Sequence, residues 1–223
     1  MNPTIVRILR VEEVIHNVRR FEVERPAGLT FVSGQAADVS INSPELKTEL
    51  RPFTFTGLND WDHLEFTIKI YNDHQGVTHH LGKLKAGDEL IIHGVFGAIH
   101  YAGEGVFIAG GAGVTPFISI FRQLEKDRAI GNNALIFSNR TSQDIILKDE
   151  FTRMLGKRFV NTLTQEKSTE FDNRKIDRQY LSEKVKDLSQ YFYICGPDAM
   201  LEDVKKMLVS LGADEKKVIT EQF

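Results

Sequence analysis

The stretch "FIAGGAGVTPFISIF", residues 107–121, decides the fold of this chain. A short apolar run leads into a glycine-rich turn, and a helical pattern follows at once. In a strand–turn–helix unit of this kind the backbone comes close to a pyrophosphate, and free N–H groups at the helix start bind the anion. Gly110, Gly111 and Gly113 permit left-handed backbone and leave no side chain in the way of a ligand.

Pro116 stands where a dinucleotide fingerprint has its third glycine. Thr115 suits the N-cap, and Pro116 suits the first helical position, where its missing N–H costs nothing. The proline therefore fixes the helix start and leaves the anion site intact. The alternative is a glycine-rich turn that only connects strand to helix, and the turn alone leaves both interpretations open.

The residues that follow position 103 predict a parallel α/β domain. The segments "GVFIAG", "NALIFSN", "RFVNTLT" and "QYFYICG" are apolar runs typical of strands buried on both faces. Helical patterns lie between or after them, and Gly212 is the expected C-cap of the last helix. Alternating strands and helices predict a parallel sheet with helices on both sides.

The first half predicts antiparallel β-structure. "HLEFTIKIY" alternates, with Leu64, Phe66 and Ile68 on one face and Glu65, Thr67 and Lys69 on the other. Several short strands at close spacing predict an antiparallel barrel or sandwich. We therefore expect two domains, residues 1–102 and residues 103–223.

Composition narrows the function classes. A net charge of −3 over 223 residues gives no sign of a nucleic-acid surface, and the lone Cys195 rules out an intramolecular disulfide or a four-cysteine metal or iron–sulfur site. No apolar run approaches the ~20 residues of a membrane span, and no cleavage signal is recognised at the N-terminus. A cytoplasmic protein without membrane insertion is expected.

A second motif, "ELRPFTFTG", lies in the first half. Arg51 can grip a diphosphate, Phe53 can lie against a flat ring, and the Thr54 hydroxyl can reach a ring nitrogen. Taken alone, these residues are better explained as an ordinary strand with a surface arginine.

Together the motifs resemble the ferredoxin–NADP reductase family of two-domain flavoprotein reductases, over nearly the whole chain. Arg51-Pro52-Phe53-Thr54 is similar to the family's flavin motif, with Phe53 in place of the usual tyrosine, so that ring stacking is kept and the phenol hydrogen bond is lost. The remaining matches, in chain order, are Gly76-Val77-Thr78, Gly94-Val95-Phe96-Gly97, the turn from Gly110 to Pro116, Cys195-Gly196-Pro197 and the ending "ITEQF".

The resemblance implies an FAD-binding Greek-key barrel of about six strands and an NAD(P)H-binding domain, with the two rings meeting and hydride passing to flavin N5. It implies roles near the reacting rings for Thr54, Cys195, Glu221 and Phe223, with Cys195 as a spacer and not a nucleophile. The cofactor-binding residues implied are Arg51, Pro52, Phe53, Thr54, Ile68, Lys69, Ile70, Gly76, Val77, Thr78, Gly110, Gly111, Gly113, Thr115, Pro116, Ser138, Arg140, Cys195, Gly196, Pro197 and Phe223.

Two further expectations concern charge and metal. No acidic residue ends the "IFSN" strand, and Arg140 can meet a 2′-phosphate, with Thr164 and Lys167 nearby in the next loop; we therefore lean to NADPH over NADH.

His74, His79 and His80 lie close in sequence, but His79 and His80 point about 100° apart on a helix. No metal site is expected.

These expectations describe a reductase that hands electrons to a separate acceptor: flavodoxin, ferredoxin or an oxygenase component. The chain itself is expected to be a monomer or weak dimer. Two alternatives stay open: a reductase of free flavin, and a flavin-carrying subunit of a larger complex without turnover of its own. A dehydrogenase without flavin is disfavoured, because the front half has neither a Tyr-x-x-x-Lys motif nor a metal site.

Overall fold

The computed structural model describes residues 2–73, 75–97 and 99–221. Two compact units emerge from the contacts along the chain. The first comprises residues 1–100 together with 115–123, and the second comprises residues 101–114 together with 124–223. The helix that follows the glycine turn is thus divided, with most of its length grouped with the first unit. The domain bounds 1–102 and 103–223 stay a prediction.

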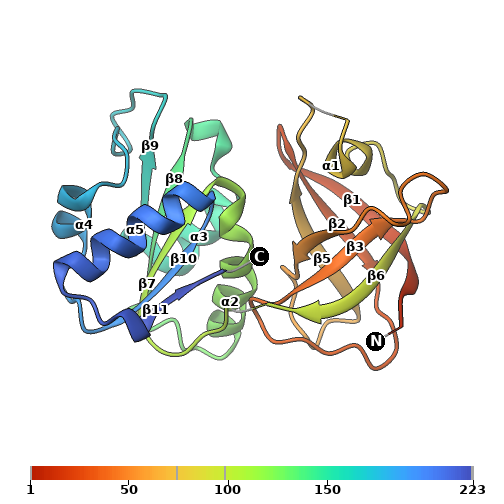
Figure 1. Ribbon diagram of the computed structural model, residues 1–223, viewed down its shortest axis with the longest axis horizontal. Coiled ribbons are helices and arrows are strands. Elements are labelled where there is room, and N and C mark those ends of the chain that lie inside the picture. The colour runs from red at the N-terminus through yellow and green to blue at the C-terminus, as the bar shows by residue number, and fades with distance from the viewer. Residues whose placement is uncertain (1, 74, 98, 222–223) are drawn as a thin grey trace. The chain divides into compact units, whose positions relative to one another are not determined.

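The first unit is built on an antiparallel sheet of six strands in the order β4-β3-β6-β1-β2-β5 (Figure 1). A bridge between Phe55 and Phe66 joins the two edge strands and closes the sheet. Strand β3 pairs with β4, the chain after β4 meets β5 through the Phe55–Phe66 bridge, and β6 returns to pair with β3. This arrangement is a Greek key. The prediction of a six-stranded antiparallel barrel is confirmed. Its elements are β1 Thr4–Ile15, β2 Val18–Glu24, β3 Ala36–Ile41, β4 Arg51–Thr54, β5 His63–Lys69, α1 Val77–Leu81 and β6 Glu89–Phe96.

Strand β5 differs from a simple two-faced strand. Leu64, Phe66 and Ile68 enter the barrel core as the alternation predicts. Glu65 and Thr67, on the opposite face, are also buried, with 3% and 4% of their surface exposed. Partners from other segments of the first unit cover this polar face, and alternation within β5 carries no sign of them.

The second unit holds a parallel sheet of five strands in the order β11-β10-β7-β8-β9 (Figure 1). The predicted parallel α/β architecture is confirmed. The strands are β7 Gly105–Gly110, β8 Ala134–Asn139, β9 Phe159–Leu163, β10 Tyr191–Cys195 and β11 Val218–Thr220, and the helices that follow them are α3 Lys148–Leu155, α4 Arg178–Lys184 and α5 Asp198–Leu211. Short 3₁₀ segments occupy Gly111–Val114, Ser142–Asp144, Gly156–Arg158 and Glu215–Lys217, and Gly212 caps α5 in the left-handed conformation.

The glycine turn is tighter than the sequence predicts. A 3₁₀ segment at Gly111–Val114 follows β7 directly, and helix α2, Thr115–Lys126, continues from it. Gly111 has a left-handed φ of +52°, and a Cβ there would meet open space. At Gly113 a Cβ would overlap the backbone carbonyl of Cys195 at the end of β10. The turn is therefore pressed against the neighbouring strand by a contact that only glycine permits.

These two glycines predict different costs of substitution. G111A places an alanine in a left-handed conformation with free space around it, so we expect a loss of about 1–2 kcal/mol in unfolding free energy. G113A forces the turn away from β10, so we expect a loss of about 3 kcal/mol. Urea unfolding of both variants and the wild type measures the order, and equal losses would contradict the contact.

Candidate nucleotide-binding sites

The predicted flavin motif forms strand β4, the first strand in the order of the barrel sheet, next to β3. Thr54 is buried opposite Ala36, and Phe53 is half-buried opposite Ala37 and packs against the barrel core. Arg51 is exposed, and its guanidinium donates to the Leu50 carbonyl at 2.6 Å and lies 3.7 Å from the Glu49 carboxylate. Because this guanidinium is exposed, its N–H donors are accessible to a diphosphate.

The loop around Gly76 lies beside the end of β5. Gly76 is the N-cap of the short helix α1, with extended φ and ψ of −80° and 179°. The Thr78 hydroxyl accepts a hydrogen bond from the Tyr71 N–H at 3.4 Å, which ties the helix start to the segment after β5. Ile68 and Ile70 are buried apolar residues, and Lys69 lies over the Tyr71 ring at 5.9 Å.

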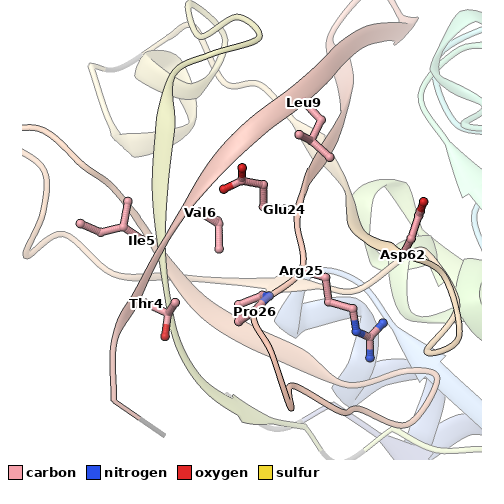
Figure 2. Close-up of a pocket in the computed structure, with 8 residues that line it drawn as sticks. All are labelled: Thr4, Ile5, Val6, Leu9, Glu24, Arg25, Pro26 and Asp62. Carbon is pink, nitrogen blue, oxygen red and sulfur yellow. The ribbon is translucent and has the colours of Figure 1, made fainter.

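Cavities of the first unit only partly involve these motifs. A cavity of about 380 Å³ opens on the outside of the barrel, and Figure 2 shows its lining around the start of β1 and the end of β2. None of the residues predicted to bind a cofactor lines it. A smaller cavity of about 100 Å³ is lined by Ile70, Asn72 and His79 among others, next to α1.

In the second unit the predicted residues gather at the carboxyl ends of three neighbouring strands. Gly110 ends β7 and pairs with Ser138 of β8, and Cys195 ends β10 and pairs with Ala109. Gly196 has a φ of +158°, and a Cβ there would lie 3.1 Å from the Gly110 nitrogen. Ligands of open α/β sheets bind at the carboxyl ends of strands, so this placement agrees with the predicted role of the turn.

Cys195 and Glu221 form a buried pair. The Cys195 thiol donates to Glu221 Oε2 at 2.9 Å, and both residues are more than nine-tenths buried. Burial and the neighbouring carboxylate both raise the pKa of the Cys195 thiol, and burial raises the pKa of Glu221 against the opposing effect of the thiol hydrogen bond. Cys195 is therefore held as a thiol, which is a poor nucleophile. Phe223 lies outside the described residues.

Two buried polar side chains at this edge have unused hydrogen-bonding capacity within the described part of the chain. Glu221 Oε1 has no partner there, and neither polar atom of the Asn139 side chain has one. Buried polar atoms normally have partners, so atoms of this kind at a strand end fit a site that receives a polar ligand. The open space at Gly111 and these atoms are compatible with a nicotinamide nucleotide. Sequence patterns gave no sign of Asn139 beyond its place after Ser138.

The loop after β9 contains an acidic group, Glu166, whose contact with the loop after β8 the sequence pattern did not reveal. Ser142 donates its N–H and hydroxyl to the Glu166 carboxylate at 2.7 and 2.9 Å. Arg140 is exposed two residues earlier, and its carbonyl accepts from the Gln165 N–H at 2.9 Å. The loops after β8 and β9 are thus tied together, with a basic and an acidic side chain on adjoining turns.

Among the residues described, no three His, Cys, Asp or Glu side chains are grouped to hold a metal ion, and no helix is long and apolar enough to cross a membrane. His79 Nδ1 lies 3.2 Å from Asn72 Oδ1, and the His79 and His80 rings meet edge to face at 5.5 Å. His74 lies outside the described residues.

The raised pKa of Glu221 predicts a particular pH dependence of stability. A carboxyl whose folded-state pKa lies above its ordinary value of 4.5 binds its proton more tightly when folded, so stability falls as pH rises from 4.5 through the folded-state pKa. E221Q resembles the protonated form and lacks this loss. We expect the Tm of E221Q minus the Tm of wild type to increase as the pH rises from about 5 to about 8.

Thermal unfolding across that range measures the difference, with E202Q on the exposed surface of α5 as the control for charge loss. A Tm difference between E221Q and wild type that stays constant over the whole pH range would contradict the burial of an ionisable Glu221.

Comparison with known proteins assigns a domain family to each half of the chain. Residues 6–101 match the family model of the oxidoreductase FAD-binding domain, and residues 107–206 match that of the oxidoreductase NAD-binding domain. The NADH-cytochrome b5 reductase 1 of Eremothecium gossypii is 28% identical over 218 residues, 89% of this chain and 75% of that protein. A nitrate reductase [NADPH] of Beauveria bassiana is 27% identical over 180 residues, 67% of this chain but 20% of that protein.

The fold has solved counterparts as well. A ferredoxin NADP⁺ reductase from Neisseria gonorrhoeae, solved with bound FAD and NADP, superposes with a TM-score of 0.84 at 20% identity, over 99% of this chain and 98% of that one. The order of an FAD-binding barrel and an NAD-binding parallel sheet is the same in the matched family models and in this chain. The chain therefore belongs to the oxidoreductases that combine an FAD-binding domain with an NAD-binding domain, and it has the fold of a ferredoxin NADP⁺ reductase.

Proposed function

We propose that this protein is an NAD(P)H-dependent flavoprotein reductase that passes electrons to a separate redox protein. The observation that carries the proposal is the meeting of Gly110, Gly113 and Gly196 at the ends of β7 and β10, directly beside the buried Cys195–Glu221 pair. This arrangement leaves a backbone surface without side chains next to a polar group of fixed position, which suits a flat, charged dinucleotide.

When bound, FAD supplies the redox chemistry, since it accepts a hydride equivalent at N5 and releases electrons one at a time. The chain provides the binding groups. We assign Arg51 to the pyrophosphate, Phe53 to stacking on the ring and the buried Thr54 hydroxyl to a hydrogen bond near N5. The Gly76-Val77-Thr78 loop completes the pyrophosphate contact.

At the nicotinamide side, Cys195 acts as a spacer and Glu221 as a buried polar group. The thiol stays protonated, because burial and the Glu221 carboxylate both raise its pKa. It therefore orients Glu221 through the hydrogen bond between them without competing for the substrate as a nucleophile. Phe223 is assigned to the flavin side by the family resemblance alone.

The acceptor is a small redox protein. Flavodoxin, ferredoxin and an oxygenase component are candidates from the family resemblance, and the relatives named NADH-cytochrome b5 reductase add a b5-type haem protein. The chain spans 20% and 28% of the matched nitrate reductases, so those proteins extend far beyond the part that it matches. A cytoplasmic location and a monomeric or weakly dimeric state belong to the same proposal.

We also propose a preference for NADPH over NADH, which rests on Arg140. Its exposed guanidinium at the end of β8 suits a 2′-phosphate. Glu166 works against this preference, because its carboxylate lies on the adjoining turn, bonded to Ser142. We therefore expect the preference to be modest.

Anaerobic titration of the FAD-loaded protein with NADH and with NADPH tests the assignment. We expect the oxidised flavin band to bleach with both donors, faster with NADPH, and the reduced protein to be reoxidised by one of flavodoxin, ferredoxin or cytochrome b5 supplied separately. Gel filtration beforehand shows whether FAD is retained.

Each alternative has its own outcome. Flavin that is lost on gel filtration but consumed when added free indicates a free-flavin reductase. Bound flavin that neither donor bleaches refutes the reductase assignment and favours a subunit without turnover. Equal bleaching rates with the two donors refute the NADPH preference alone.

A further inference from the structure

Glu65 is a carboxylate inside the first unit, on the face of β5 opposite the barrel core. Its side chain is 4% exposed. The Thr56 hydroxyl donates to Glu65 Oε1 at 2.7 Å and lies 3.1 Å from the Thr67 hydroxyl. Arg20 Nε is 3.6 Å from Glu65 Oε2, on the other side of the carboxylate. A charge held this deep needs a close counter-charge to be tolerated.

That counter-charge comes from helix α2. Arg122 Nη1 donates to Glu65 Oε1 at 2.6 Å and to the Thr56 carbonyl at 3.0 Å, and its side chain is 10% exposed. Its guanidinium also lies 5.6 Å from the centre of the Trp61 ring. Contacts with Glu65, Thr56 and Trp61 therefore hold the Arg122 guanidinium in place, and they fix the position of the helix at this residue.

A second polar contact lies one turn nearer the start of the helix. The buried Ser119 hydroxyl accepts the Gly34 N–H at 3.0 Å. Gly34 has a φ of +101°, and a Cβ there would clash with the Ile99 carbonyl, so this loop has little freedom to shift. Ser119 and Arg122 are three residues apart and share one helix face. Two directional contacts on one face fix both the rotation and the axial position of α2.

Helix α2 begins where the glycine turn ends. Arg122 is seven residues after Thr115, about 10 Å along a rigid helix, so a displacement at Arg122 is transmitted to the turn. A buried ion pair stabilises a protein no better than apolar side chains of similar volume, but it is far more directional. The Arg122–Glu65 pair is thus better suited to placing the helix than to holding the fold together.

We propose that Arg122 is a positioning residue for hydride transfer: through Glu65 on β5 it fixes the rotation and axial position of α2, the helix into which the nucleotide-binding turn leads. This inference rests on the proposed function. Arg122 contacts Glu65 and Thr56 and is assigned no contact with either cofactor. Its loss is expected to slow the transfer step and to leave the binding of each cofactor nearly unchanged.

The test compares FAD-loaded R122K and E65M/R122M with wild type by anaerobic stopped-flow mixing with NADPH. R122K keeps the charge and loses the planar fork; E65M/R122M removes both charges, and Arg20 keeps its ion pair with Glu12 at 3.3 Å. We expect the limiting rate of flavin reduction to fall about 10- to 100-fold in both variants. FAD retention and the donor Kd from the concentration dependence should change by no more than about twofold.

The matched control is E125Q, which breaks the exposed ion pair between Glu125 of the same helix and Arg153 of α3. Its limiting rate should stay within about twofold of wild type. Wild-type limiting rates in either variant overturn the proposal, as does a loss of FAD or of folding in both, which would make the pair structural only. If wild type itself is not reduced, the proposed function fails; the inference is judged by the ratio of variant to wild-type rates.

Discussion

The contact between the carboxyl ends of β7 and β10 is the constraint on which the rest of the second unit depends. Gly110, Gly113 and Gly196 lie so close together that a side chain on any of them would meet backbone or a packed neighbour. This contact bends the chain into a 3₁₀ turn before α2 starts. It also leaves bare backbone beside the Cys195–Glu221 pair, which is the surface that we propose for a dinucleotide.

Local patterns in the sequence were sufficient to predict the architecture of both units. Apolar runs such as "ALIFSN" predicted buried parallel strands, because strands covered on both faces need few polar residues. Alternation in β5 predicted a strand with one face in a barrel core, and the glycines of the turn predicted the strand-to-helix transition. The helix start was placed by Thr115 and Pro116, and the structure adds a 3₁₀ segment before it.

Contacts between segments far apart in the chain were not predictable in this way. Glu65 appears as the polar side of an alternating strand, and its contact with Arg122, 57 residues later, explains how its charge is tolerated in a buried position. The hydrogen bond from Cys195 to Glu221 and the pairing of Ser142 with Glu166 are of the same kind. Such pairs depend on the topology that brings strands and loops together, and periodicity within one segment carries no information about the partner.

The central claim is that the turn after β7 binds a nicotinamide dinucleotide through bare backbone. Isothermal titration of the FAD-loaded protein with NADP⁺, for wild type and G111D, tests it most directly. Gly111 faces open space, so the aspartate is accommodated without overlap and places a negative charge where a pyrophosphate would lie. We expect wild type to bind and G111D to lose at least about tenfold in affinity with FAD retained. Equal affinities for the two proteins would contradict the account.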